Sequence, residues 1–434
     1  MNLSIISIGT ELTLGLILNE NSRYIAERIT DLGIECKYMY TVSDNSDEIS
    51  NTLRQSLKYS DLIIISGGLG PTDDDVTRSA VASALNLKLI RDRNLDSTSL
   101  KFVRKPKSKR ITERLLRQSY IPAGSFPIKP ELGSASGFRI ELDGRKYIFC
   151  IPGVPKEMRS MFEKEVVPFL KRRLTNKDLK GNVFKIRKST LLTTDISETE
   201  IEEKIKEIAG EARNIGVQIG ITADPGLTKI ILVAQSTDIV EAGRNLKRIE
   251  EKISGKLGNY FYGKDDTLVS DNLKEAIARI RGNLTISIAE SITGGLISSI
   301  VTDTPGSSKF FLGSIVSYSD YSKIKLLDID KSVLKRYGAV SREVCLNMAR
   351  KVREIFDSDY SLSVTGYAGP EAESGIVGLV YCCILGPSGY EKVFEKNFPG
   401  TRYEIKFRTA QFILNELRAA ISKKKSEKDK FIER

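Results

Sequence analysis

One serine in the C-terminal half of the chain follows an apolar run and has potential proton partners close behind it. Ser291 comes just after the run Leu284–Ala289, and Tyr318 and Lys323 follow at the end of the next run. The sequence contains no histidine, so Ser-His-Asp and Cys-His catalysis and HExxH zinc sites are excluded. A serine nucleophile in this chain therefore needs a lysine or a tyrosine as its proton partner, and both are present.

The turn around this serine has two interpretations. Residues Glu290–Gly295 lead into a predicted helix, whose first N–H groups could stabilise an oxyanion or bind phosphate. The simpler alternative is that Ser291 or Thr293 only caps the helix, and the turn taken alone favours that alternative. The lysine and tyrosine of the next run shift the preference toward a serine hydrolase. A third run ends in the glycine-bearing loop Thr365–Pro370, which is either part of the same site or a plain turn.

Acidic and glycine residues follow three apolar runs near the N-terminus. The first run ends at Gly9–Glu11, the second at Asp44 and the third at Gly67–Asp75. Because the carboxyl ends of parallel strands lie at one edge of a sheet, these residues are expected to meet there. Glycines let the backbone approach phosphate, and carboxylates beside phosphate indicate a bridging divalent cation. The predicted metal ligands are Glu11, Asp44, Asp74 and Asp75, with a simple helix cap as the alternative for Asp75.

These residues need a scaffold of parallel strands, and the apolar pattern predicts one in each half of the chain. Strands predicted at Asn2–Ile8, Ile34–Thr41 and Leu62–Ser66 alternate with helices at Asn21–Leu32, Asp47–Leu57 and about Val76–Leu85. The alternation returns near residue 265, with strands near 284–289, 313–318, 360–365 and 378–385 and a long terminal helix from about 403. The fold class is therefore α/β, with two parallel-sheet α/β domains joined by a small α+β module. The predicted boundaries are 1–173, 174–264 and 265–422, followed by a basic tail at 423–434.

Composition and charge limit the partners. The chain of 434 residues carries a formal net charge of +11, which favours anionic partners such as phosphorylated small molecules. Much of the excess lies in Lys101–Arg117, a candidate rim for an anionic substrate or a plain solvated loop, and in Lys423–Arg434, interpreted as a frayed tail. No apolar run approaches the ~18–20 residues of a membrane span, and no signal peptide is evident. We expect a cytoplasmic homo-oligomer with reduced cysteines, no membrane partner and no nucleic-acid partner.

Four N-terminal motifs resemble the first domain of the CinA family (competence/damage-inducible protein A). They are GTEL, TVSDN, GGLGPTDDDVT and IPGVPKEM, which begin at Gly9, Thr41, Gly67 and Ile151. That domain is related to the molybdopterin-binding fold, and in some members it is similar to a metal-dependent ADP-ribose pyrophosphatase. The resemblance implies a phosphate-bearing substrate held by Gly9, Thr10, Gly67, Gly68, Gly70 and Thr72. Arg114 and Leu115 depart from the family, which often has two asparagines there.

The C-terminal half resembles the CinA C-terminal domain, which is similar to nicotinamide mononucleotide (NMN) amidohydrolase. The shared motifs are AESITGG, VSYSDYSK, YGAVS, VTGYAGP, VGLVY and FPGTR. The resemblance implies that Ser291 is the nucleophile, that Tyr318 and Lys323 assist proton transfer, and that no cofactor is needed. It further implies a nucleotide pocket lined by Glu290, Thr293, Gly294, Gly295, Thr365, Gly366, Ala368, Gly369 and Arg402. The loop Glu371–Ile376 departs from the family, which usually has a longer Gly-rich stretch with a lysine.

The resemblance implies a hydrolase of pyridine-nucleotide metabolites. The C-terminal site would deamidate NMN to nicotinate mononucleotide, and the N-terminal site would cleave the pyrophosphate of ADP-ribose. Two other functions stay open: a non-catalytic accessory of DNA uptake or repair, and a molybdopterin-binding protein. The sequence contains no helix-turn-helix, RNA-recognition or zinc-finger signature, which places the DNA hypothesis second.

Overall fold

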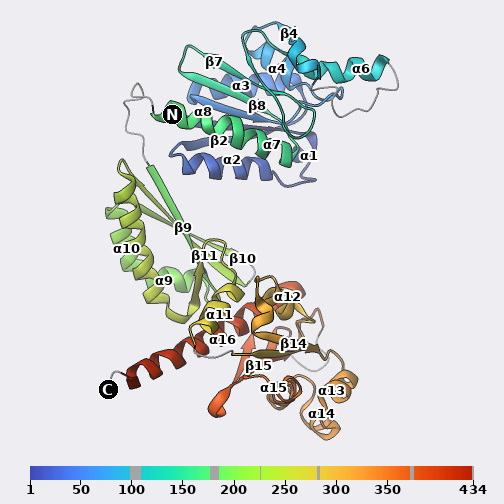
Figure 1. The fold of residues 1–434 in the computed structure, drawn as a ribbon, viewed down its shortest axis with the longest axis vertical. Coiled ribbons are helices and arrows are strands. Elements are labelled where there is room, and N and C mark those ends of the chain that lie inside the picture. The colour runs from blue at the N-terminus through green and yellow to red at the C-terminus, as the bar shows by residue number, and fades with distance from the viewer. Residues whose placement is uncertain (98–108, 176–184, 225, 281–283, 372–375, 433–434) are drawn as a thin grey trace. The chain divides into compact units, whose positions relative to one another are not determined.

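The computed structural model describes residues 1–97, 109–175, 185–224, 226–280, 284–371 and 376–432 (Figure 1). The chain divides into two compact units. The first comprises Met1–Arg187 with Gln235–Ala242, and the second comprises Lys188–Ala234 with Gly243–Arg434. Of the predicted basic rim, residues 101–108 lie outside the described part, as does most of the departing loop after Glu371.

The sheet of the first unit has six strands in the order β2-β1-β3-β8-β7-β6. Strands β2, β1, β3 and β8 run parallel, whereas β7 and β6 are antiparallel additions at one edge. The strand bounds are Asn2–Ile8 (β1), Glu35–Val42 (β2), Leu62–Ser66 (β3), Phe126–Ile128 (β6), Gly137–Leu142 (β7) and Lys146–Ile151 (β8). The apolar central strands are buried on both faces, as parallel sheets require. The predicted parallel core is confirmed, and the antiparallel edge is an addition to it.

Helices cover both faces of this sheet, because successive side chains of each strand point to opposite sides. Leu3 and Ile5 of β1 share one core with Ile25 of α2 and Phe162, whereas Ile6 packs with α3 and α4 on the other face. The helix bounds are Thr10–Thr13 (α1), Glu20–Asp31 (α2), Ser46–Tyr59 (α3), Thr77–Ala84 (α4), Lys109–Leu116 (α6), Pro155–Met161 (α7) and Val167–Thr175 (α8). A π-helical turn, Phe162–Val166 (η3), joins the last two. The small strands β4 (Leu89–Arg91) and β5 (Tyr120–Pro122) pair with each other, and 3₁₀ turns lie at Arg93–Leu95 (η1) and Arg117–Ser119 (η2).

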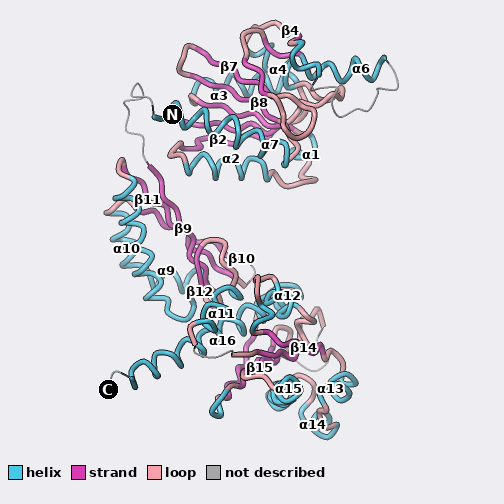
Figure 2. The backbone as a smooth tube through the Cα atoms, in the orientation of Figure 1, coloured by secondary structure: helices cyan, strands magenta, loops and turns pink. Residues whose placement is uncertain are grey.

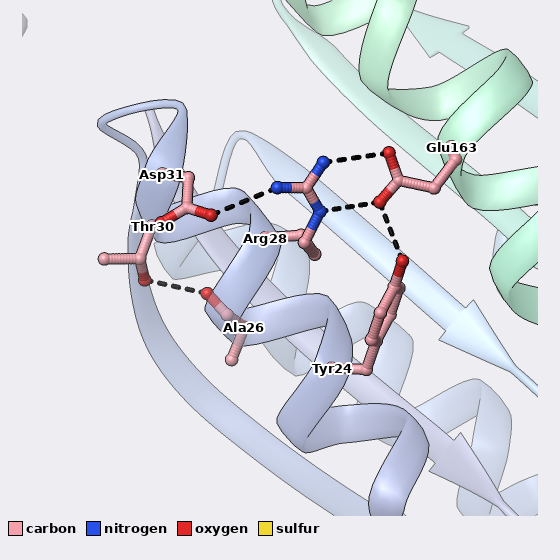
Figure 3. Close-up of polar contacts among 6 residues, drawn as sticks. All are labelled: Tyr24, Ala26, Arg28, Thr30, Asp31 and Glu163. Atoms are coloured by element: carbon pink, nitrogen blue, oxygen red, sulfur yellow. Dashed lines mark hydrogen bonds and ion pairs between the residues drawn. The ribbon is translucent and has the colours of Figure 1, made fainter. Parts of the chain in front are cut away.

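An ion pair fastens α2 to the turn η3, which is more than 130 residues further along the chain (Figure 3). Arg28 donates from Nε at 2.7 Å and from Nη2 at 3.0 Å to the two carboxylate oxygens of Glu163. Tyr24 donates its hydroxyl to the same carboxylate at 2.8 Å. The hydrogen bonds from Arg28 lower the pKa of Glu163 from its usual value. Two helices on the same face of the sheet are therefore joined by a bidentate charged contact as well as by apolar packing.

The middle module has a four-stranded sheet in the order β10-β11-β9-β12 (Figure 2). Its elements are β9 (Lys185–Thr193), α9 (Glu198–Asn214), β10 (Val217–Asp224), β11 (Leu227–Ser236), α10 (Ile239–Leu257), a 3₁₀ turn Gly258–Tyr260 (η4) and β12 (Phe261–Lys264). The pairs β10–β11 and β9–β12 are antiparallel. This confirms the predicted α+β module.

The sheet of the C-terminal part has the order β14-β13-β15-β16-β17. Strands β14 (Phe311–Val316), β13 (Ile286–Glu290) and β15 (Tyr360–Gly366) are parallel, and β16 (Leu379–Leu385) and β17 (Glu391–Asn397) are antiparallel. The helices are α11 (Val269–Ala278), α12 (Leu296–Thr302), α13 (Asp320–Leu327), α14 (Lys331–Tyr337), α15 (Arg342–Phe356) and α16 (Arg402–Ile432), with 3₁₀ turns at Ser307–Lys309 (η5) and Pro387–Gly389 (η6). The parallel arrangement of β13, β14 and β15 brings the three predicted strand ends to one edge.

Three further expectations can be compared with this fold. The backbone of α16 continues to Ile432, so the described part of the segment predicted as a frayed tail is helical. All five cysteines are free thiols, as expected, and Cys150, Cys345, Cys382 and Cys383 are buried. Among the described helices, none combines the length and apolar character that a bilayer crossing would require.

Candidate functional sites

The carboxyl ends of β1, β2, β3 and β8 surround a cavity of about 930 Å³ in the first unit. The predicted residues that line it are Gly9, Glu11, Asp44, Gly67, Gly68, Gly70, Thr72, Asp74 and Asp75. Thr10 instead binds Asp44, donating its backbone N–H at 2.8 Å and its hydroxyl at 2.9 Å to one carboxylate oxygen. The ends of β1 and β2 are therefore tied together beside the cavity.

The turn after β3 needs its glycines for steric reasons. Gly67 has φ of +115°, and a Cβ there would lie 2.3 Å from the carbonyl oxygen of Ile8. Gly68 has φ of +63°, and a Cβ there would lie 2.2 Å from the Thr77 hydroxyl, which in turn donates to the Gly67 carbonyl at 2.8 Å. The glycines thus allow the turn to pack directly against β1 and the start of α4, leaving the loop backbone along the cavity.

The four predicted metal ligands fall into two pairs. Asp75 accepts hydrogen bonds from the backbone N–H groups of Gly70 (2.7 Å) and Thr72 (2.8 Å), so it fastens the loop, while Asp44 is bound to Thr10. The side chains of Glu11 and Asp74 have no hydrogen-bond partner within the described residues. No group of three or more His, Cys, Asp or Glu side chains in the described part lies close enough to share a metal ion.

This donor set still fits one type of ion. Mg²⁺ is commonly bound by one or two carboxylates together with substrate phosphates and water. Glu11 and Asp74 would hold such an ion, and the ion would supply charge neutralisation of a pyrophosphate. Asp44 and Asp75 already accept hydrogen bonds from Thr10 and from their own loop, and the four-residue ligand set Glu11, Asp44, Asp74 and Asp75 stays a prediction.

Two polar residues on the cavity wall were not proposed from the sequence. Asn21, from α2, donates to the Gly153 carbonyl at 2.7 Å, and its buried Oδ1 has no partner among the described residues. Glu157, in the first turn of α7, also lines the cavity, and burial raises the pKa of its carboxyl. Glu157 could have been identified from the sequence, because it follows β8, the fourth of the parallel strands, within the motif that begins at Ile151.

Ser291 and Lys323 are in direct contact at the edge of the C-terminal sheet. Lys323 Nζ donates to Ser291 Oγ at 3.1 Å and to the carbonyl oxygens of Ser317 (3.1 Å) and Tyr318 (3.2 Å). The lysine is only 1% exposed, and burial lowers the pKa of its ammonium group. Lys323 lies in the first turn of α13, whose N-cap is Ser319. The predicted pair is therefore brought together, by a helix that the sequence analysis did not identify.

Glu290 has a structural place in this site. Its carboxylate is fully buried and accepts hydrogen bonds from Thr293, Gly295, Ile297 and Ser298. These donors lie in the turn and first helical residues that follow Ser291. Both carboxylate oxygens are used inside the protein, so Glu290 and the Thr293 hydroxyl hold the turn, and their place in the nucleotide pocket stays a prediction.

Two backbone N–H groups in the same turn remain available. In the described part of the chain the N–H groups of Ile292 and Thr293 have no acceptor, although both residues are at least 95% buried. Gly294 and Gly295 follow with φ of +60° and +98°, a path that favours glycine. Unpaired N–H groups next to a serine hydroxyl are suited to stabilise an oxyanion.

Arg402 connects the remaining predicted residues. It donates to the Gly369 carbonyl at 2.5 Å and to the Tyr318 hydroxyl at 2.6 Å. Tyr318 is 58% exposed and its hydroxyl accepts a hydrogen bond from Arg402; within the described residues no hydrogen bond joins it to Ser291, and its part in proton transfer stays a prediction. Ala368 is buried nearby in the loop that begins at Thr365.

The other two loop residues have contacts that fix the backbone. Thr365 donates its hydroxyl to the Ala339 carbonyl at 2.8 Å. A Cβ at Gly366 would lie 2.6 Å from the Leu379 carbonyl oxygen, so this position requires glycine. A further cation was missed by the sequence analysis: Lys406 Nζ lies 3.8 Å from the point where a Cβ of Gly294 would stand. Lys406 could have been identified from the sequence by its spacing of one helical turn from Arg402.

Comparison with known proteins matches three successive segments of the chain to three family models. Residues 4–172 match the family model of a probable molybdopterin binding domain, 188–263 that of the damage-inducible protein CinA KH domain, and 270–421 that of the CinA C-terminal domain. The chain is 38% identical to a putative competence-damage inducible protein of Halothermothrix orenii, over 94% of this chain and 95% of the relative. It is 37% identical to a CinA-like protein of Dictyoglomus thermophilum, over 97% and 99% of the two chains. A crystal structure of CinA from Thermoplasma acidophilum, titled as of unknown function, aligns with 38% of this chain and 96% of its own at 31% identity and a TM-score of 0.36.

Proposed function

The chain belongs to the CinA family, and from that premise we propose that its C-terminal domain is a serine amidohydrolase that deamidates nicotinamide mononucleotide. The observation that carries this proposal is the hydrogen bond between buried Lys323 and Ser291 in a protein without histidine. A neutral lysine amine can accept the proton of a serine hydroxyl, and burial favours the neutral form.

The chemistry follows from the atoms in contact. Ser291 Oγ attacks the carboxamide carbon of the substrate, and its proton passes to the neutral Nζ of Lys323. The carbonyl electron pair moves to oxygen, where the N–H groups of Ile292 and Thr293 stabilise the negative charge. Lys323 then returns the proton to the amide nitrogen, the C–N bond breaks, and ammonia leaves. Water hydrolyses the resulting ester, releasing the carboxylate product and restoring the Ser291 hydroxyl.

The phosphate of a mononucleotide needs a cationic partner in the same site. Arg402 and Lys406 lie one turn apart at the start of α16, and Lys406 is close to the turn that carries Ser291. Guanidinium and ammonium groups bind phosphate through charge-assisted hydrogen bonds. We propose that these two residues hold the nucleotide phosphate, with Arg402 leaving its internal contact to Tyr318 when the substrate binds.

Ammonia release from NMN by the Ser291→Ala variant tests the nucleophile. We expect the loss of at least about 10³-fold in kcat, because nucleophilic catalysis cannot proceed without the hydroxyl. Ser299→Ala, at an exposed position of α12, is the matched control and should retain parental activity. Full deamidase activity in the Ser291→Ala variant would show that the nucleophile is assigned wrongly.

The N-terminal cavity supports a second activity. We propose that it hydrolyses the pyrophosphate of ADP-ribose with a divalent cation at Glu11 and Asp74, as the glycine-lined turn and the unpaired carboxylates suggest. Hydrolysis of ADP-ribose should persist in the Ser291→Ala variant, because the two sites belong to different compact units. Tight binding of molybdopterin without ADP-ribose hydrolysis would favour a pterin-binding role for this cavity. Salt-sensitive DNA binding with neither activity would favour the accessory role.

A further inference from the structure

A second cavity of about 520 Å³ adjoins the N-terminal cavity, and we call it the annex cavity. It shares Gly70, Thr72 and Asp75 with the larger cavity, so the loop after β3 forms a wall between the two. Its other side is formed by residues of β4, α6, η2 and β5, among them Glu113 and Arg117. The helix α6 and Arg117 belong to the basic stretch 101–117 that the sequence indicated as a candidate rim for an anionic substrate.

Two arginines converge on the carboxylate of Asp73; Asp73 and Arg117 line the annex cavity, and Arg114 reaches Asp73 from beside it. Arg114, on α6, and Arg117, on η2, donate hydrogen bonds to different oxygens of Asp73. The two arginines and the aspartate are 43%, 56% and 61% exposed, and ion pairs at this exposure are held weakly. Planar guanidinium groups bind carboxylate and phosphate with the same donor geometry. Asp73 therefore occupies a position that a phosphoryl group could take instead.

A third arginine on the annex wall is buried and has no carboxylate bonded to it. Arg78 is 5% exposed, and within the described residues it donates to the carbonyl oxygens of Leu69 and Ser136, both at 2.9 Å. Its buried Nε has no partner among the described residues. Burial lowers the pKa of this guanidinium to about 10, which leaves it cationic at neutral pH. The nearest carboxylate on the same wall, Asp75, is committed to the backbone N–H groups of its own loop.

The remaining polar groups on the wall restrict what the phosphoryl group can be attached to. Glu113 lines the annex cavity and has no hydrogen-bond partner within the described residues. A carboxylate beside an anion site repels a second anion but accepts hydrogen bonds from hydroxyl groups. Tyr120 adds a second hydroxyl-binding group on the same wall. The combination suits a sugar that carries a single phosphate.

We propose that the annex cavity binds a phosphorylated sugar through Arg114, Arg117 and Arg78, and that Asp73 occupies the arginine pair until this ligand displaces it. The proposal deepens the N-terminal function and rests on it for the identity of the sugar. Hydrolysis of ADP-ribose at the shared wall produces ribose 5-phosphate, which the annex cavity would receive, while the nucleoside phosphate stays in the larger cavity.

Equilibrium dialysis of the full chain with ribose 5-phosphate tests the proposal directly. Buffer with EDTA removes any contribution from a metal ion in the larger cavity. Asp73→Asn should bind about three- to tenfold more tightly than the parent, because the internal competitor loses its charge. The double variant Arg114→Ala/Arg117→Ala should bind about tenfold more weakly or worse. Arg145→Ala, which removes a positive charge at the opposite end of the sheet, is the control and should match the parent.

The gain of affinity separates binding from misfolding, since a damaged fold cannot bind more tightly. Equal affinities in the parent, Asp73→Asn and the double arginine variant, or no binding in any of them, would overturn the proposal. Measuring ADP-ribose hydrolysis in parallel separates the two hypotheses. Arginine-dependent binding without hydrolysis would retain the annex cavity and reject the pyrophosphatase. Hydrolysis of ADP-ribose by the parent, together with ribose 5-phosphate binding that is the same in the Asp73 and arginine variants, would support the pyrophosphatase and reject the annex cavity as a binding site.

Discussion

Replacing Glu290 by glutamine distinguishes a residue that holds the active-site turn from one that contacts the substrate. One carboxylate oxygen accepts from Thr293 Oγ1 (2.7 Å), Gly295 N (2.9 Å) and Ile297 N (3.1 Å). The other accepts from the backbone and the hydroxyl of Ser298. A glutamine can keep its single oxygen toward the first three donors. Its NH₂ group then faces the Ser298 N–H, and two donors oppose each other.

The cost of this substitution can be estimated from these contacts. Leaving a buried N–H without an acceptor costs about 1–3 kcal/mol, and the three retained bonds weaken because their acceptor becomes neutral. The total is about 3–5 kcal/mol, a large part of the ~5–15 kcal/mol by which domains are stable. For a unit of this size the corresponding fall in Tm is about 6–20 °C.

Calorimetry and steady-state kinetics of Glu290→Gln provide the assay. We expect the unfolding transition of the C-terminal unit to fall by the amount above while that of the N-terminal unit stays unchanged. We also expect kcat for ammonia release to fall, because Ser291 lies at the start of the loosened turn. Glu275→Gln, at a surface pair with Arg279, is the control and should change Tm by less than about 2 °C. Unchanged stability with a raised KM would refute the structural role and favour substrate contact.

Two other predictions concern pH and metal. Burial lowers the pKa of Lys323, so its neutral, proton-accepting form appears at lower pH than in an exposed lysine. Ammonia release should therefore rise with pH along a limb that lies below the one expected for an exposed lysine. A pH profile of kcat/KM checks this, and persistence of the limb in Lys323→Met would contradict it. EDTA should abolish ADP-ribose hydrolysis and leave NMN deamidation unchanged. Glu11→Gln should raise the Mg²⁺ concentration needed for half-maximal hydrolysis of ADP-ribose. Loss of both activities in EDTA would show that the metal serves another purpose.

The scaffold could be predicted because its central strands are strongly apolar and are separated by amphipathic helices. The predicted ends of Asn2–Ile8 and Leu62–Ser66 agree with the observed strands to the residue. Strands with one exposed face were harder to identify. The edge strand Glu391–Asn397 is mostly polar and largely exposed, so no apolar run marks it.

The partners within each site could be predicted only as far as the common sheet edge. The approach of Lys323 to Ser291 depends on α13, an eight-residue helix whose N-cap serine is matched by another serine at the third helical position instead of a glutamate. The roles of Glu290 and Asp75 depend on turns that bend the backbone N–H groups back onto the carboxylate. The spacing of residues in the sequence does not show how the backbone turns. A carboxylate that binds the N–H groups of its own loop therefore cannot be distinguished, from the sequence, from one that faces a ligand.

The pairing of β3 with β8 has a consequence for synthesis of the chain. β3, Leu62–Ser66, lies between β1 and β8, and about 80 residues separate it from β8 along the chain. At ~5–20 residues per second, translation of that interval takes roughly 4–16 s. During this time the edge of an Ile-rich strand on the nascent chain has no native neighbour. The first half of the sheet therefore emerges from the ribosome as a substrate for chaperones, and codons or loops that lengthen the interval would lower the yield of folded protein.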